Sequence, residues 1–216
     1  MARSHEVLGG RWTLLIVREL LFGSRGFNDI RRGIPRISRT VLSERLKTLT
    51  HIGVIERVAG TPDYTLTPAG RELIEVVGAL ATWGQRWLPR DTAREDIDLG
   101  PVLVDMERRV RFDALPPEPI VVRFDFTGHQ RQFMLLKRSE ASICHANPGF
   151  PEPLSLTGKV AALAAWWRGD ASFLQARRSG LALEGPRPMV NAFPTWFERY
   201  LFADIAPASA DQLVGA

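Results

Sequence analysis

The sequence predicts an α+β protein in two parts, a mainly helical N-terminal half and a C-terminal half that mixes strands with helices. A chain of 216 residues with 45% hydrophobic residues is long enough to form two cores. Apolar residues recur every three or four positions in the first half, whereas a clear alternating run appears in the second. Between them, residues 88–100 contain a proline, a glycine and an acidic cluster. We therefore predict domains at residues 1–90 and 101–216, joined by a linker at 91–100.

Two helical segments open the first half. A stripe formed by the apolar residues Trp12, Leu15, Ile16 and Leu20, with Glu19 on the same face, predicts the first helix, which Gly23 ends. A short second helix is predicted by Phe27, Ile30 and Ile34.

A third helix follows a chain break at Gly33 and Pro35. Ser38 is well placed as its N-cap, because a serine hydroxyl accepts a hydrogen bond from a free backbone N–H of the first turn. Gly53 ends the helix, whose core face is formed by Val41, Leu42, Leu46 and Leu49.

A hairpin and a long helix complete the first half. Residues 54–58 and 64–67 are rich in strand-forming side chains, and the turn-prone segment 59–63 separates them. From Pro68 to Trp87, apolar residues recur at helical spacing. The order of three helices, a hairpin and a helix is that of a winged helix-turn-helix domain.

The charge is distributed unevenly along the chain. Residues 1–90 contain 14 Lys and Arg against 8 Asp and Glu, whereas residues 91–216 contain 14 against 16. A basic half beside a slightly acidic one is expected where only the first half meets a polyanion. We therefore expect double-stranded DNA as the partner of residues 1–90.

The third helix carries the residue types that contact DNA. In a helix-turn-helix the second helix of the pair enters the major groove with its first turns. Arg39 is the candidate for a guanine contact, because its planar fork can bond two acceptors at once. Short hydroxyls and cations around it are candidates for bases and phosphates. The full set of predicted DNA contacts is Arg31, Arg32, Arg36, Ser38, Arg39, Thr40, Ser43, Lys47, and on the hairpin Arg57 and Thr61.

The second half begins its regular structure with strands. Residues 120–126 alternate between two faces: one is formed by Ile120, Val122, Phe124 and Phe126, and the other by Val121, Arg123 and Asp125. Residues 133–136 and 140–145 predict two further strands. Helices are expected at residues 157–168, near 171–178 and at 193–201, the last because of a strong apolar stripe.

Metal and catalytic chemistry find little support in the sequence. Cys144 is the single cysteine, and the four histidines are scattered, so no paired ligand spacing is present. We predict no catalytic residues, no metal site and no cofactor, and expect Cys144 to be buried in the core. An enzyme using Cys144 or His145 with Asp125 or His129 remains an alternative without a supporting motif.

The first half resembles the HxlR-type transcriptional regulators. The resemblance runs from about His5 to Trp87 and rests on the segments 8–23, 27–31, 37–46, 53–57 and 64–70, which follow in the family's order and spacing. It implies a winged helix fold, DNA binding and a homodimer formed through residues around 5–8 and the helix at 68–87. Such regulators often carry a cysteine just before the first helix, and residues 1–5 contain none.

The second half resembles the sterol carrier protein fold more loosely, through residues 156–159, 167–171 and 176–185. That resemblance implies an apolar pocket and a small apolar effector. The predicted lining residues are Phe124, Phe126, Phe133, Trp166, Phe173, Trp196 and Phe197, and ordinary core packing is the alternative for each.

The sequence therefore predicts a ligand-responsive DNA-binding regulator. Four alternatives stay open: a C-terminal half that is only a structural or oligomerisation module, a lipid-handling protein, an enzyme, and an RNA-binding or non-specific architectural protein. No run approaches the roughly 20 apolar residues of a membrane helix and no signal pattern opens the chain, so no membrane contact and a cytoplasmic location are expected.

Overall fold

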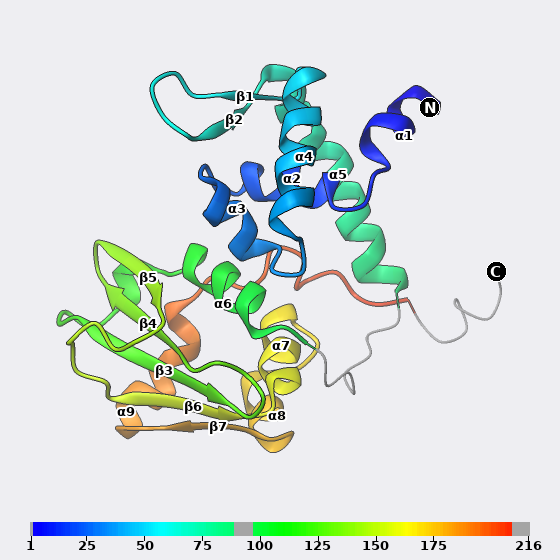
Figure 1. Ribbon diagram of the computed structural model, residues 1–216. Coiled ribbons are helices and arrows are strands. Elements are labelled where there is room, and N and C mark those ends of the chain that lie inside the picture. Colours follow the sequence, from blue (N-terminus) through cyan, green and yellow to red (C-terminus); the bar gives the residue numbers. More distant parts are fainter. Residues whose placement is uncertain (1, 89–96, 209–216) are drawn as a thin grey trace. The chain divides into compact units, whose positions relative to one another are not determined.

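The computed structural model describes residues 2–88 and 97–208 (Figure 1). The chain divides into two compact units, Met1–Trp87 and Leu88–Ala216, each with its own hydrophobic core. Most of the predicted linker lies outside the described residues. Its end is wrong, because Asp98 caps a helix by accepting a hydrogen bond from the Gly100 N–H, so Leu99 and Gly100 already form a helical turn.

The first unit contains the predicted order of helices and hairpin, preceded by one short helix (Figure 1). Its elements are α1 (Ala2–Leu8), α2 (Thr13–Leu21), α3 (Phe27–Gly33), α4 (Arg39–His51), β1 (Ile55–Arg57), β2 (Tyr64–Leu66) and α5 (Pro68–Trp87). The predicted bounds of α5 are confirmed, and the hairpin strands are one or two residues shorter than predicted. The fold is therefore a helix-turn-helix followed by a two-stranded wing.

A single core holds these helices and the wing together. Ile16 of α2, Leu42 and Leu46 of α4, and Ile55 of the wing are at most 1% exposed. Burial of such side chains contributes about 1.5–3 kcal/mol each. The same apolar positions that predicted the helices therefore fix how they pack.

A buried carboxylate joins α2 to the end of α3. Glu19 is 1% exposed and lies against Gly33, where a Cβ atom would be 2.0 Å from its Oε2. Arg18 pairs with Glu19 and also donates to the Gly33 carbonyl oxygen at 3.1 Å. A side chain at position 33 would displace the Glu19 carboxylate, so glycine there allows this contact to hold the chain before α4.

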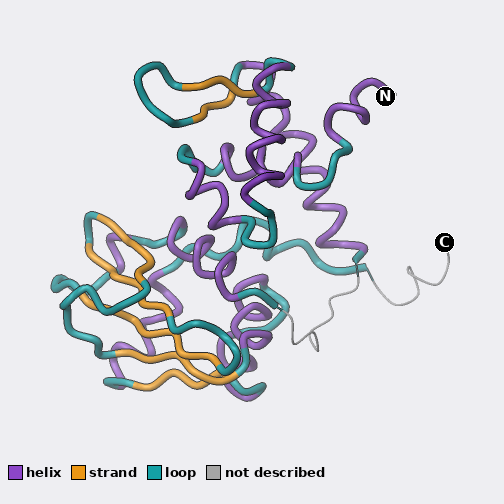
Figure 2. The backbone as a smooth tube through the Cα atoms, viewed as in Figure 1, coloured by secondary structure: helices purple, strands orange, loops and turns teal. Residues whose placement is uncertain are grey.

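The second unit is a five-stranded sheet with helices (Figures 1 and 2). Its strands are β3 (Ile120–Phe126), β4 (Gln132–Lys137), β5 (Glu140–Cys144), β6 (Leu154–Gly158) and β7 (Leu181–Glu184), in the spatial order β5-β4-β3-β6-β7. Its helices are α6 (Leu99–Arg108), α7 (Val160–Arg168), α8 (Phe173–Arg178) and α9 (Arg187–Ala192), with short 3-10 turns at Phe112–Ala114 and Phe193–Trp196. β3 and β6 are parallel, and the other neighbours are antiparallel.

The two faces of this sheet differ in what covers them. Side chains such as Val122 and Phe124 join the large core, together with residues of the other strands and of the helices. The opposite face carries a small cluster of Val121, Phe133 and Leu135, with Cys144 and Phe150 packed against it. Cys144 is half-buried rather than buried as predicted.

Two predicted helices of the second unit are wrong in part. The helix predicted at 157–168 begins only at Val160, because Thr157 and Gly158 pair with β3 and β7. The helix predicted at 193–201 is a 3-10 turn that ends at Trp196. Phe197 is extended, since the Arg111 N–H donates to the Trp196 carbonyl and the Glu198 N–H donates to the Arg109 carbonyl.

Candidate nucleic-acid interface and effector pocket

The turn between α3 and α4 sets the start of the candidate recognition helix. Ser38 has extended backbone angles, and its hydroxyl accepts a hydrogen bond from the Val41 N–H at 3.2 Å. The predicted N-cap is therefore confirmed. Because the hydrogen bond of the cap occupies one acceptor site of the Ser38 hydroxyl, the first role of this hydroxyl is to stabilise the start of α4.

The two faces of α4 carry different residue types. Leu42, Leu46 and Leu49 are at most 1% exposed and point into the core. Arg39, Thr40 and Lys47 are exposed, and Ser43 is half-buried beside them. A helix with one face anchored in a core presents its other face as a rigid unit. The predicted reading residues of α4 thus lie on one outward surface, which we call the α4 face, with exposed Arg36 just before the helix.

One acidic residue on the α4 face was not among the predicted contacts. Glu44 is exposed and, by helical geometry, lies between Thr40 and Lys47. A carboxylate there repels phosphate and can accept a hydrogen bond from the amino group of cytosine. The place of Glu44 on this face follows from the same helical periodicity, so it could have been predicted from the sequence.

The two arginines of α3 are placed less simply than predicted. Arg32 pairs with Asp29 at 2.7 Å, and both side chains are about half-exposed. Arg31 is half-buried, and its Nε has no hydrogen-bond partner among the described residues. A buried guanidinium nitrogen without a partner is costly.

The wing holds its predicted contacts in defined positions. Arg57 donates to the Tyr64 hydroxyl at 3.0 Å and lies over the ring of the same tyrosine. Thr61 donates to the Val58 carbonyl and accepts from the Asp63 N–H. Arg57 is thus a pre-ordered cation, whereas the hydroxyl of Thr61 is used in shaping the tip.

A row of exposed apolar side chains runs along α5. Val76, Leu80 and Trp83 are 45%, 53% and 53% exposed and follow at spacings of four and three. Leu73 and Val77, on the adjacent side of the helix, pack against the core of the unit. This row, the α5 stripe, leaves large apolar side chains without cover on one helix face.

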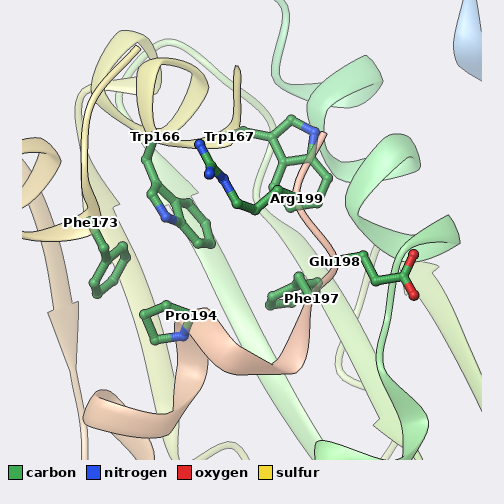
Figure 3. A pocket seen from close by; sticks show the side chains of 7 residues that line it. All are labelled: Trp166, Trp167, Phe173, Pro194, Phe197, Glu198 and Arg199. Carbon is green, nitrogen blue, oxygen red and sulfur yellow. The ribbon is translucent and has the colours of Figure 1, made fainter. Parts of the chain in front are cut away.

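The predicted effector-pocket residues fall into three groups in the second unit. Trp166, Phe173 and Phe197 line a pocket of about 280 Å³ together with Trp167, Pro194, Glu198 and Arg199 (Figure 3). Phe124, Phe126 and Trp196 are at most 2% exposed and belong to the core. Phe133 is placed wrongly by the prediction, because it pairs with Arg123 and so faces the opposite side of the sheet.

The pocket wall is fixed by polar contacts with α6. The Trp167 indole Nε1–H donates to Asp105 at 2.7 Å, and Arg109 lies 3.5 Å from the same carboxylate. The Arg109 guanidinium also donates to the Arg199 carbonyl at 3.3 Å. These contacts were not predicted, since they join residues 62 and 90 positions apart.

The described residues hold no group of three or more His, Cys, Asp or Glu side chains suited to a metal ion. Among the same residues, no helix is both long and apolar enough to cross a membrane. The α4 face and the aromatic pocket are thus the two candidate functional sites among the described residues.

The fold and the basic α4 face define a winged helix-turn-helix protein. Residues 7–92 match the family described as HxlR-like helix-turn-helix. The regulator YvaP of Bacillus subtilis is 40% identical over 88 residues, which span 38% of this chain and 82% of YvaP. The chain therefore belongs to the HxlR-like helix-turn-helix family.

Two further proteins are similar to part of this chain. An HTH-type transcriptional regulator of Mycobacterium tuberculosis is 42% identical over 95 residues, or 42% of this chain, and the chain spans only 60% of its length. The quinone-bound crystal structure of YodB from Bacillus subtilis is 37% identical, covering 39% of this chain and 92% of that chain with a TM-score of 0.36. The family and these relatives are transcriptional regulators, not enzymes.

Proposed function

We propose that the chain is a homodimeric transcriptional regulator that reads duplex DNA through the α4 face and responds to a small molecule bound in its second unit. The observation that carries the proposal is the capped, core-anchored α4 with Arg39, Thr40 and Lys47 outward. A rigid helix that presents an arginine fork fits the major-groove edge of guanine. The DNA phosphate backbone is contacted by Arg31, Arg36, Ser43 and Arg57. The hydroxyls of Ser38 and Thr61 are used mainly in hydrogen bonds within the protein.

The α5 stripe supports the homodimer. Uncovered apolar residues on one helix face of a small unit are typical of an interface between two copies. A two-fold dimer places two recognition helices on one side, so its operator is a near-palindrome with half-sites roughly 10 base pairs apart.

The second unit is proposed to carry the effector response. YodB has a quinone-bound form. The only cysteine of this chain, Cys144, lies on β5 of the second unit, so we place sensing at the aromatic pocket rather than at a thiol before the first helix. The pocket wall is hydrogen-bonded to α6 and to Arg109 just after it, and α6 is the first helix among the described residues of the second unit. A ligand that favours one position of α6 therefore shifts the DNA-binding equilibrium by its differential affinity. We propose that the five-stranded sheet and its helices form a sterol-carrier-like domain.

The experiment for DNA reading starts with selection of duplexes by the full chain from a random library. Affinity for the selected and a scrambled duplex is then measured at two salt concentrations. Arg39→Ala is expected to weaken binding to the selected duplex by about 1–3 kcal/mol. Arg178→Ala, an exposed arginine of α8, is the matched control and should leave it unchanged.

Arg39→Lys separates base reading from charge. Lysine keeps the charge but lacks the fork, so specificity should fall while the salt dependence stays. Full activity of Arg39→Lys would overturn the guanine contact. Enrichment of no sequence, together with strong salt-dependent binding, would favour the architectural alternative.

The homodimer is tested by sedimentation of Leu80→Glu. A charge in the α5 stripe should give a monomer and weaken binding to a palindromic duplex. Ile74→Glu is the control, because Ile74 is also exposed but lies roughly 120° away around the helix. Dimers in both variants would contradict the role of the stripe.

A further inference from the structure

We infer that the aromatic pocket of the second unit binds a small aromatic carboxylate, whose ring lies against Trp166 and Phe173 and whose carboxylate pairs with Arg199. The inference deepens the proposed effector response and rests on it for its biological meaning. It names a ligand class that differs from the lipid or acyl chain suggested by the sterol carrier resemblance.

The size of the pocket limits the ligand. Its volume is about 280 Å³, whereas pockets for drug-sized ligands measure about 300–1,000 Å³. One ring or two fused rings fit such a space. A long acyl chain or a sterol would need a deeper cavity.

The walls of the pocket favour a flat ring. Trp166 meets Phe173 at a centroid distance of 5.0 Å and Trp167 at 5.9 Å, in both cases edge to face. Pro194 and Phe197 line the same pocket. Edge-to-face packing fixes each ring through its neighbours, so a planar ligand meets preformed surfaces and few side chains must be reordered.

Arg199 provides the charge. Figure 3 shows its side chain beside the indoles of Trp166 and Trp167. Gly169 ends α7 with φ of +83°, and a Cβ there would be 2.9 Å from Arg199 Nη2, so the missing side chain leaves room for the guanidinium. Its present partner is Asp204 at 3.0 Å, and this pair is 64% and 89% exposed. An ion pair so exposed is weak, and a carboxylate ligand can replace Asp204.

The second charged residue of the pocket separates anionic from cationic ligands. Aromatic walls with a carboxylate would suit an organic cation. In Figure 3, however, the Glu198 carboxylate points away from the tryptophan rings. The guanidinium of Arg199 is the charged group that lies beside these rings. The charge arrangement therefore selects an anion.

The test uses three probes of nearly equal size and different charge: naphthoate, naphthalenemethanol and naphthylmethylammonium. Oleate is added as a long acyl carboxylate. Binding of each to the full chain is measured by isothermal titration calorimetry at moderate salt. Naphthoate is expected to bind about tenfold more tightly than the alcohol, and more tightly than the cation or oleate.

Two variants assign the contacts. Arg199→Gln should lower naphthoate affinity about tenfold and leave the alcohol unchanged, because only the charge-assisted contact is lost. Phe173→Ala should weaken both probes. Arg178→Gln is the matched control on an exposed arginine and should change neither.

The measurement is repeated on the Arg39→Ala chain, so that failure of DNA reading and failure of the pocket are distinguished. Naphthoate affinity there should equal that of the unaltered chain. Preference for the cation or for oleate, an unchanged naphthoate affinity in Arg199→Gln, or no naphthoate binding below about 1 mM would each overturn the inference.

Discussion

Arg39 and Lys47 stand exposed on α4, whereas Trp167 and Phe197 line the pocket of the second unit while being only 4% and 5% exposed. In the first unit, the candidate functional side chains lie opposite the leucines that hold the helix. In the second, the aromatic residues that form the site also pack in or against the core. Changes at the first site should therefore alter binding without altering stability, and changes at the aromatic residues of the second should alter both.

The largest effect is expected for Phe197→Ala. The Phe197 ring lies perpendicular to Trp167 at 6.0 Å and packs on Phe193 at 5.3 Å. Its removal should cost about 3–5 kcal/mol in the free energy of unfolding of the second unit and abolish naphthoate binding. Denaturant titration of the full chain, followed by circular dichroism, measures this cost. Arg39→Ala should lie within about 0.5 kcal/mol of the unaltered chain. An unchanged stability of Phe197→Ala would break the comparison between the two units.

Stability of the first unit should depend on a position without functional chemistry. Gly70 packs at the start of α5, where a Cβ would be 2.1 Å from the Val54 carbonyl oxygen, a backbone atom. The Thr67 hydroxyl stabilises the start of α5, because it donates to the Gly53 carbonyl and accepts from the Gly70 N–H. Gly70→Ala should therefore destabilise the unit by about 1–3 kcal/mol.

Gly78→Ala is the matched control on the same helix. A Cβ there meets nothing within 4 Å, so alanine should stabilise the helix by about 0.5–1 kcal/mol. The same denaturant titration compares the two variants. Equal effects at both glycines would show that helix propensity, rather than the contact with Val54, governs position 70.

The contrast between the units also explains what the sequence could predict. In the first unit the signals are local: Ser38 caps α4 from three residues away, and the spacing within 68–87 defines α5. The outward placement of Arg39 and Lys47 follows from the same periodicity. Local signals were enough because each of these helices is defined by its own residues.

In the second unit the decisive contacts join distant segments. β6 lies parallel to β3 in a pairing that no local pattern announces. Phe197 belongs to a run of apolar residues at helical spacing, yet its β-bridge to Val110 holds its backbone extended. Residues 133–136 are all apolar, so alternation did not reveal which face each side chain takes. Arg199 was missed because its place in the pocket depends on α7 and the C-terminal segment meeting.

The smallest effect is expected for Lys47→Ala on the α4 face. A flexible ammonium contacts phosphate as a point charge, so the loss should weaken binding to all duplexes nearly equally and lower the salt slope by about 1. Fluorescence anisotropy at several salt concentrations measures both quantities, with unfolding stability as the control. Glu44→Gln on the same face should change binding in the opposite direction, because it removes a negative charge near the phosphates. If Lys47→Ala instead changed the preference between duplexes, Lys47 would touch a base, and the division between Arg39 as reader and Lys47 as anchor would be wrong.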